Sequence, residues 1–204
     1  MVRRLVRLAL LAAMAFLLML WEIQLTPLLP FIPAYLKYDP GDLPVLLGGF
    51  AFGPAAGVAV AWVKDILFLL SGKSTAGWIG VGANFLASAA YVVPAAWLYR
   101  RIGARWGLAL AVLAGTLSTT AVMAVANYYV FLPLWGVPAE QVGSTIITAI
   151  TPFNLIKGTL TGTLALVAYP RLARALGDPV FAARRGEEWA GEAAREAGQG
   201  WHRS

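Results

Sequence analysis

Residues 42–70 read DLPVLLGGFAFGPAAGVAVAWVKDILFLL, and this stretch contains two apolar segments that meet at Gly53-Pro54. A Gly-Pro pair is a strong turn signal, and proline suits the first turn of a helix because its missing N–H is not needed there. We therefore predict two short helices, 42–52 and 54–70, that form a tight hairpin.

Apolar sequence continues on both sides of this hairpin, over residues 5–172. The 204-residue chain is 59% hydrophobic and 13% charged, with a mean hydropathy of +0.70, whereas soluble domains carry about 25% charged residues. One membrane crossing needs about 20 residues. We predict an all-α integral membrane protein with six transmembrane helices in one domain, 1–176, the helices being 5–24, 42–52, 54–70, 77–99, 106–131 and 152–172. The remaining residues, 177–204, are expected to form a mobile cytoplasmic tail.

Arginines mark the orientation of these six helices. They lie at the N-terminus, in the loop at 100–105 and after residue 169, three regions that share one side of a six-span model. The positive-inside rule makes that side cytoplasmic, so both termini are predicted to be cytoplasmic and the loops 26–40, 71–76 and 132–143 to face outward. We expect a multi-pass protein of the cell (plasma) membrane.

The residue inventory argues against an enzyme. The chain has no cysteine, and its one histidine, His202, lies in the tail, so no catalytic triad or His/Cys metal cluster is available. Residues 71–75, SGKST, look like the end of a phosphate-binding loop, but the first glycine of that motif is replaced by Leu67. The basic residues form no stripe among exposed aromatics, so nucleic acid is not an expected partner. We predict no catalytic residue, no metal site and no bound cofactor.

Four charged residues of the membrane domain admit more than one role. Lys64 and Asp65 lie inside an apolar segment, where they either reach the membrane surface or pair with other helices, or else contact a ligand or coupled ion. Asp39 and Asp42 stand at a predicted helix start, where aspartate commonly caps the helix.

The segment TPFNLIKG at 151–158 is the best candidate for a binding site. Asn154 and Lys157 are three residues apart and share one helix face. Asn127, with Tyr128 and Tyr129, is expected at a similar depth in the preceding helix. Such groups suit a flat, neutral heteroaromatic ligand in an outward-facing pocket. The alternative is that the amides bond neighbouring helices and the tyrosines form an interfacial belt.

Small residues recur at four-residue spacing, which permits close contact between helices. Examples are Ala9 and Ala13 in the first helix, and Gly158 and Gly162 in the last. Packing within the chain is one meaning of this pattern. A docking face for another membrane subunit is the other, and it is most plausible for the first helix.

Five segments together resemble a known family. They are LKYDPGDLP at 36–44, GGFAFGPAAG at 48–57, ANFLAS at 83–88, NYY at 127–129 with Pro133, and PFNLIKG at 152–158. In this order they resemble the substrate-binding S components of energy-coupling factor (ECF) transporters, specifically the riboflavin type. That resemblance implies a six-helix protein that binds its vitamin from outside under a lid formed by the first outer loop.

The resemblance also implies the site residues and partners. Asn127, Asn154 and Lys157 match polar contacts of the flavin site, the lid corresponds to Leu36, Tyr38 and Asp39, and Asn84 is placed in the pocket wall. Ala9 and Ala13 would dock onto a transmembrane coupling subunit driven by two cytoplasmic ATPases. The expected ligand is riboflavin, which is transported and not kept as a cofactor.

The sequence thus predicts a riboflavin-binding specificity subunit of an ATP-driven importer in the lipid bilayer. Two alternatives stay open. The same scaffold could bind another vitamin or heteroaromatic precursor. In a different class, a stand-alone secondary transporter would use Lys64 and Asp65 to carry coupled ions.

Overall fold

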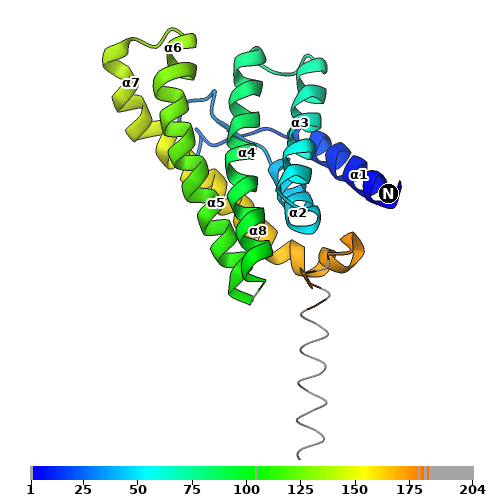
Figure 1. Cartoon of the computed structure of the whole chain (residues 1–204). Coiled ribbons are helices and arrows are strands. Elements are labelled where there is room, and N and C mark those ends of the chain that lie inside the picture. The colour runs from blue at the N-terminus through cyan, green and yellow to red at the C-terminus, as the bar shows by residue number, and fades with distance from the viewer. Residues whose placement is uncertain (1, 104, 179, 182, 184–204) are drawn as a thin grey trace, which may run out of the picture.

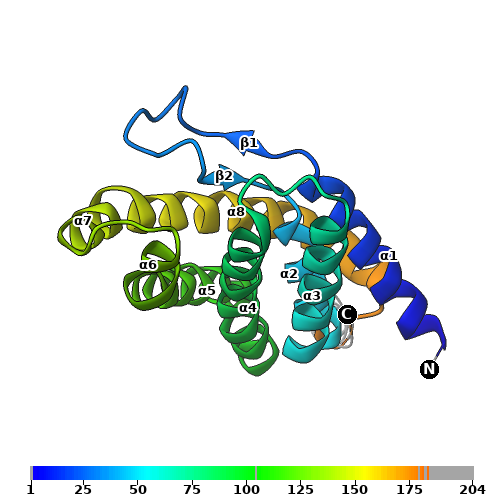
Figure 2. The ribbon, with the colours of Figure 1, turned by 90° about the horizontal axis from the view of Figure 1, so that it is seen from above.

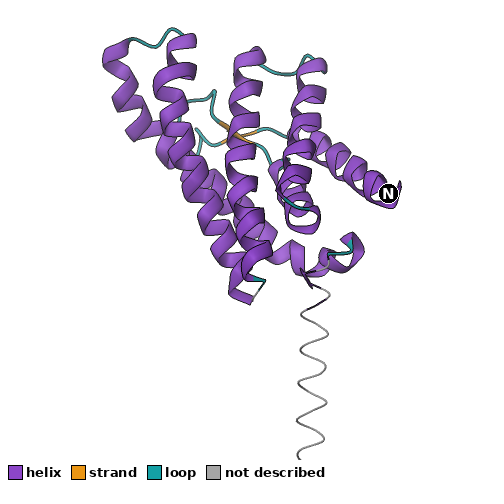
Figure 3. Cartoon of the chain, viewed as in Figure 1, coloured by secondary structure: helices purple, strands orange, loops and turns teal. Residues whose placement is uncertain are grey.

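The computed structural model describes residues 2–103, 105–178, 180–181 and 183. Helices make up most of this part of the chain, with one short two-stranded sheet (Figure 3). The longer helices are α1 Val2–Met19, α2 Asp42–Phe52, α3 Pro54–Leu70, α4 Gly77–Ile102, α5 Arg105–Ala126 and α8 Thr151–Leu176. The shorter elements are β1 Ile23–Gln24, β2 Lys37–Tyr38, α6 Leu132–Leu134, α7 Ala139–Thr145 and the π-helical turns η1 Asn127–Phe131 and η2 Ile146–Ile150.

The α2–α3 hairpin has the bounds that the sequence predicts. Gly53 joins the two helices with φ 100°, a conformation that favours glycine, and Pro54 begins α3. Further along, Gly49 and Gly57 face each other so closely that a Cβ at Gly57 would lie 3.0 Å from the Cα of Gly49. Glycine at both positions lets the two helices pack backbone to backbone against Val92 of α4.

Two long rods follow α4, and they correct the predicted loop at 132–143. The first rod runs without a break through α5, η1 and α6, and the second through α7, η2 and α8. Pro133 lies one residue before the end of the first rod, so the hydrogen bond that proline removes is at the very end of the helix. The chain turns instead at Gly136, which has φ 74°, and Pro138 precedes α7.

Aromatic rings fill the centre of the helix bundle. Phe50 of α2 packs against Tyr99 of α4 and Tyr169 of α8, with each pair of ring centroids 5.2 Å apart. Both tyrosine hydroxyls donate to Oδ2 of the buried Asp178, at 2.8 and 2.6 Å. This cluster ties the C-terminal end of α8 to α2 and α4, which lie beside it in Figure 1.

The outer surface is strongly apolar. Large aliphatic side chains are exposed along α1 and α5, among them Leu10, Leu113 and Leu117. Within the described residues, two helical runs, Gly77–Ile102 and Trp106–Leu134, are long and apolar enough to cross a membrane. An apolar exterior over most of a helix bundle is typical of contact with lipid.

The segment between α1 and α2 differs from the prediction of a helix up to residue 24. The helix ends at Met19, and β1 pairs antiparallel with β2 through Ile23 with Tyr38 and Gln24 with Lys37. Figure 2 shows this segment running alongside α8. A small apolar cluster that includes Leu25, Ile32 and Phe153 attaches it to α8. We call residues 20–41 the lid.

The predicted mobile tail, 177–204, lies largely outside the described residues. Gly177 ends α8 in a left-handed conformation, and the Arg7 side chain donates to the carbonyl of Leu176 at 2.8 Å. The α1 helix is therefore joined to the end of α8.

Candidate ligand-binding site

A cavity opens between the lid and the helix bundle. It holds about 810 Å³ of empty space, a volume that includes its open mouth. Six of the residues predicted for the site line it: Leu36, Asp39, Asn84, Asn127, Asn154 and Lys157. Its walls also carry the rings of Tyr35, Phe68, Trp135 and Phe153. The cavity thus combines a few polar groups with aromatic walls.

The two asparagines stand at the π-helical turns of the two rods. Asn127 begins η1, and Asn154 follows four residues after the end of η2. Each side chain donates through Nδ2 to a carbonyl one turn earlier in its own rod, Met123 and Ile150 respectively, at 2.8 Å. Neither side chain therefore bonds to a neighbouring helix, which was the alternative to a role in ligand binding. Each amide oxygen is left available to a ligand in the cavity, as is one N–H. Single π-turns inside α-helices occur often at functional sites.

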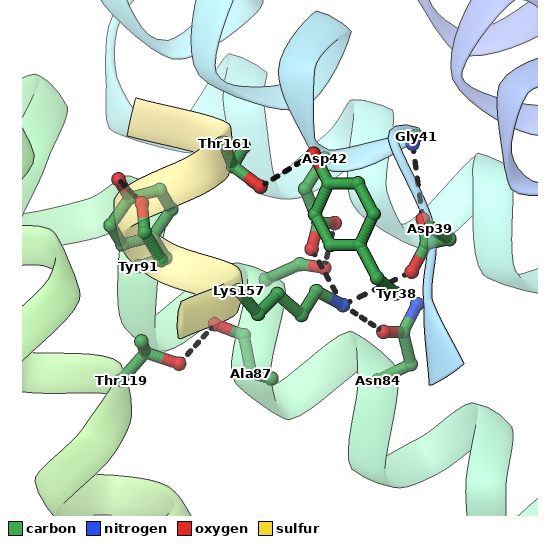
Figure 4. A network of polar contacts seen from close by, with 12 residues as sticks. Tyr38, Asp39, Gly41, Asp42, Asn84, Ala87, Tyr91, Thr119, Lys157 and Thr161 are labelled. Carbon is green, nitrogen blue, oxygen red and sulfur yellow. Dashed lines mark hydrogen bonds and ion pairs between the residues drawn. The ribbon is translucent and has the colours of Figure 1, made fainter. Parts of the chain in front are cut away.

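Lys157 lines the cavity, and its ammonium group is surrounded by acceptors (Figure 4). Its Nζ lies 3.0 Å from Asp39 Oδ2, 2.9 Å from Asp42 Oδ2 and 2.8 Å from Asn84 Oδ1. An ammonium group has three N–H donors, so these three acceptors can take all of them. The charge of Lys157 is therefore neutralised inside the bundle.

A second lysine lies deeper, on α3. Lys64 is 0% exposed and donates to Asp42 Oδ1 at 2.7 Å and to Ser88 Oγ at 3.3 Å. Asp39 and Asp65 lie 3.8 Å from the same ammonium group. Lys64 therefore pairs with side chains of other helices and does not extend to the membrane surface. A buried charge needs such partners.

The prediction that Asp42 caps a helix is wrong. The capping position of α2 is Gly41, no side chain caps that end, and Asp42 is the first helical residue. Its buried carboxylate instead forms ion pairs with Lys64 and Lys157 and accepts a hydrogen bond from the Ser88 hydroxyl. Asp39 does have a local role, because its Oδ1 accepts from the backbone N–H of Gly41 at 3.1 Å.

The mouth of the cavity carries an ion pair between Lys37 and Glu22. Lys37 of β2 lies 2.5 Å from Glu22 and donates to the Thr75 hydroxyl at 3.1 Å. All three side chains line the cavity. They join the two ends of the lid to the α3–α4 connection, and no local sequence pattern indicates that these segments lie close together.

Tyr38, predicted for the site, lies beside the cavity and is not among the residues that line it. Its ring is buried, and its hydroxyl lies 3.5 Å from the Thr161 hydroxyl. Burial raises the pKa of this phenol above its ordinary value of 10.0, so the hydroxyl keeps its proton. Tyr38 thus anchors the lid to α8.

The remaining predicted positions fall elsewhere. Ala9 and Ala13 are exposed on α1, away from the cavity. The SGKST segment forms the turn between α3 and α4, where Lys73 is exposed. No cluster of metal-binding side chains occurs within the described ranges.

Comparisons with known proteins agree on one family. A family model described as "ECF transporter, substrate-specific component" matches residues 3–169. The chain is 36% identical to the riboflavin transporter RibU of Staphylococcus aureus over 180 residues, which cover 85% of this chain and 92% of that protein. It is 32% identical to the riboflavin transporter FmnP of Bacillus subtilis over 165 residues, 77% of this chain and 85% of that one.

A solved structure gives the same result for the fold. The S component of a bacterial ECF transporter matches with a TM-score of 0.72 and 36% sequence identity, over 85% of this chain and 97% of that chain. The resemblance carried by the five short segments is thus confirmed over most of the chain.

Proposed function

Because the chain belongs to the substrate-specific components of ECF transporters, a family of membrane transport proteins and not of enzymes, we propose that it captures riboflavin for import. Similar proteins from Staphylococcus aureus and Bacillus subtilis are named riboflavin transporters. The chemistry of the cavity supports the same ligand for this chain.

The observation that carries the proposal is the set of polar groups on the cavity wall. Asn127 and Asn154 each keep an amide oxygen and one N–H for a ligand, and Lys157 lies nearby on the same wall. The pyrimidine edge of a flavin alternates carbonyl acceptors with an N–H donor, which the two amides can satisfy together. Lys157 can donate to a flavin carbonyl in exchange for one of its three acceptors. The rings of Trp135 and Phe153 offer apolar faces to the flat ring system.

In this proposal the ligand enters from outside under the lid and leaves unchanged. Leu36, Asp39 and Asn84 contribute the remaining wall, Tyr38 supports the lid, and riboflavin is cargo and not a cofactor. Six helices cross the cell membrane, with both termini in the cytoplasm, because the exposed arginines lie at the predicted cytoplasmic ends.

Transport would require partner chains. Membership in the family implies an ECF module, and we propose that it consists of a transmembrane coupling subunit and two cytoplasmic ATPases. The exposed Ala9 and Ala13 would form the docking face on α1, since small side chains permit close helix contact.

The alternative of an ion-coupled secondary transporter loses its main support. It required Lys64 and Asp65 to bind transported ions, but Lys64 is paired internally with Asp42 and Asp65 bonds to Asn84. Another vitamin on the same scaffold stays the nearest alternative.

An absorption and fluorescence spectrum of the detergent-purified protein, followed by titration of ligand-stripped protein with riboflavin, tests the proposal. Saturable quenching of flavin fluorescence at one equivalent is expected. No quenching would exclude riboflavin and direct the search to other vitamins. Uptake by this chain alone under an ion gradient, without ATP, would contradict the proposed mode of transport.

A further inference from the structure

Asp65 is a buried carboxylate that does not line the cavity. It lies on α3, is 2% exposed, and its Oδ2 has no hydrogen-bond partner among the described residues. A buried carboxylate with one unpaired oxygen is costly, especially in an apolar bundle. An interaction elsewhere in the molecule should therefore offset this cost.

The other oxygen of Asp65 fixes the orientation of Asn84. Oδ1 of Asp65 accepts a hydrogen bond from Asn84 Nδ2 at 3.0 Å. The opposite end of the same amide, Oδ1, then accepts from Lys157 Nζ at 2.8 Å. An amide has a donor end and an acceptor end, so holding one end determines which end meets the ammonium group.

Without Asp65, no hydrogen bond would hold the Nδ2 end of the Asn84 amide, so the amide could turn around. A turned Asn84 amide would present N–H groups to the N–H groups of Lys157, and two donors cannot bond each other. Lys157 would keep only its two aspartate partners, Asp39 on the lid and Asp42 on α2. Its ammonium group would then move toward them, away from α4.

We propose that Asp65 is a positioning residue for ligand binding, which acts through the Asn84 amide to hold the Lys157 ammonium group at the cavity wall. The path crosses three helices, α3, α4 and α8, in two hydrogen bonds. Lys64, 3.8 Å from Asp65, partly offsets the charge of the carboxylate within the bundle. The pair Lys64-Asp65 thereby supports the site without contacting the ligand.

The inference rests on the proposed ligand, so the first measurement is riboflavin titration of the wild-type protein. The Asp65→Leu variant removes the acceptor and keeps the branching at Cγ, and we expect its riboflavin affinity to fall at least tenfold. Asp65→Asn can still accept from Asn84 through its amide oxygen, and its affinity should stay within about threefold of wild type.

A matched control separates this effect from the general loss of a buried carboxylate. Asp178 is also 2% exposed but lies at the far end of α8, bonded to Tyr99 and Tyr169. Asp178→Leu should lower the unfolding temperature while the riboflavin affinity of the folded protein is unchanged. Equal losses of affinity in Asp65→Leu and Asp178→Leu would overturn the inference.

Two further sets of variants test the path itself. In a Lys157→Met background, Asp65→Leu should cause no additional loss of affinity, whereas an equal loss in both backgrounds would mean a merely structural role.

The second set exchanges the donor and the acceptor, and it also serves if Asp65→Leu does not fold. Asn84→Asp sets two carboxylates against each other and should weaken binding. Adding Asp65→Asn should restore binding, because residue 65 then donates and residue 84 accepts. Absence of that rescue would also overturn the inference.

A readout without ligand distinguishes failure of the two proposals. The labelling rate of Lys157 by an amine-reactive ester, followed by mass spectrometry, should rise several-fold in Asp65→Leu and not in Asp65→Asn. If wild-type protein ignores riboflavin but the labelling rates behave this way, the ligand is wrong and the positioning role stands. Equal labelling rates in all three proteins would contradict the positioning role.

Discussion

At the scale of single residues, Asn154 shows how a helix can present a polar group to an aromatic ligand. Its Nδ2 is held by the carbonyl of Ile150, which fixes the side chain, and its oxygen is left for the cavity. We predict that Asn154→Ala weakens riboflavin binding by about 1–3 kcal/mol, since a buried polar edge of the ligand loses its partner. Flavin fluorescence quenching would measure a loss of affinity of about fivefold to 150-fold.

Thr163 supplies the control for this prediction. It lies on the same helix and makes the same kind of bond to a carbonyl one turn earlier, Thr159, but it is exposed on the outer surface. Thr163→Ala should leave the affinity unchanged. A loss in both variants would point to the helix and not to the cavity.

Residue patterns could identify part of this site before the structure. Asn154 and Lys157 were predicted because their spacing places them on one face of a single helix. The partners of Lys157 could not be read that way, since Asn84 is 73 positions away and Asp39 is 118 positions away. The role of Lys64 stayed open for the same reason, because only the fold brings Asp42 and Ser88 beside it.

At the scale of elements, the Glu22–Lys37 pair connects the two ends of the lid. We predict that Glu22→Gln increases the dissociation rate of riboflavin about twofold to fivefold, because a partly exposed ion pair contributes about 0.2–1 kcal/mol. Stopped-flow fluorescence would give this rate. Glu140→Gln, on the exposed first turn of α7, should leave it unchanged. A rate equal to wild type in Glu22→Gln would show that the pair does not hold the lid.

The α2–α3 hairpin has its own prediction. Gly57→Ala should lower the stability by about 1–3 kcal/mol, since the added methyl group would meet Gly49 and Val92. Thermal unfolding in detergent should show a lower midpoint. A Cβ at Gly82, on α4, meets nothing within 4 Å, so Gly82→Ala should not lower the midpoint. Equal midpoints for Gly57→Ala and wild type would mean that the helices can separate without loss.

Elements set by local sequence were predictable, and those set by distant contacts were not. The α2–α3 hairpin followed from Gly53-Pro54 alone. The predicted loop at 132–143 is too long because proline was expected to break the helix, whereas the first rod includes Pro133 and ends one residue later. The β1–β2 pairing joins residues about 14 positions apart over an irregular loop, and no alternation of apolar residues announces it.

At the scale of the whole molecule, binding and transport are expected to use different surfaces. Ala13 is exposed on α1 and is not among the residues that line the cavity. We predict that Ala13→Trp keeps riboflavin affinity but abolishes uptake in vesicles that contain the ECF module, because the bulky ring prevents close helix contact.

Leu117→Trp controls for bulk on the outer surface. Leu117 is exposed on α5 and carries a large side chain already. Uptake should stay near the wild-type rate in this variant. Normal uptake by Ala13→Trp, on the other hand, would remove α1 from the proposed docking face.

The saturated ammonium group of Lys157 has a calorimetric consequence. Because Asp39, Asp42 and Asn84 already accept its three N–H groups, a riboflavin carbonyl can join only by replacing one of them. That exchange conserves the number of hydrogen bonds, so it adds little heat of binding. The free energy of binding must then come mainly from burying the flavin ring and releasing water from the cavity. Burial of apolar surface gives binding a negative change in heat capacity, which calorimetry at several temperatures would measure.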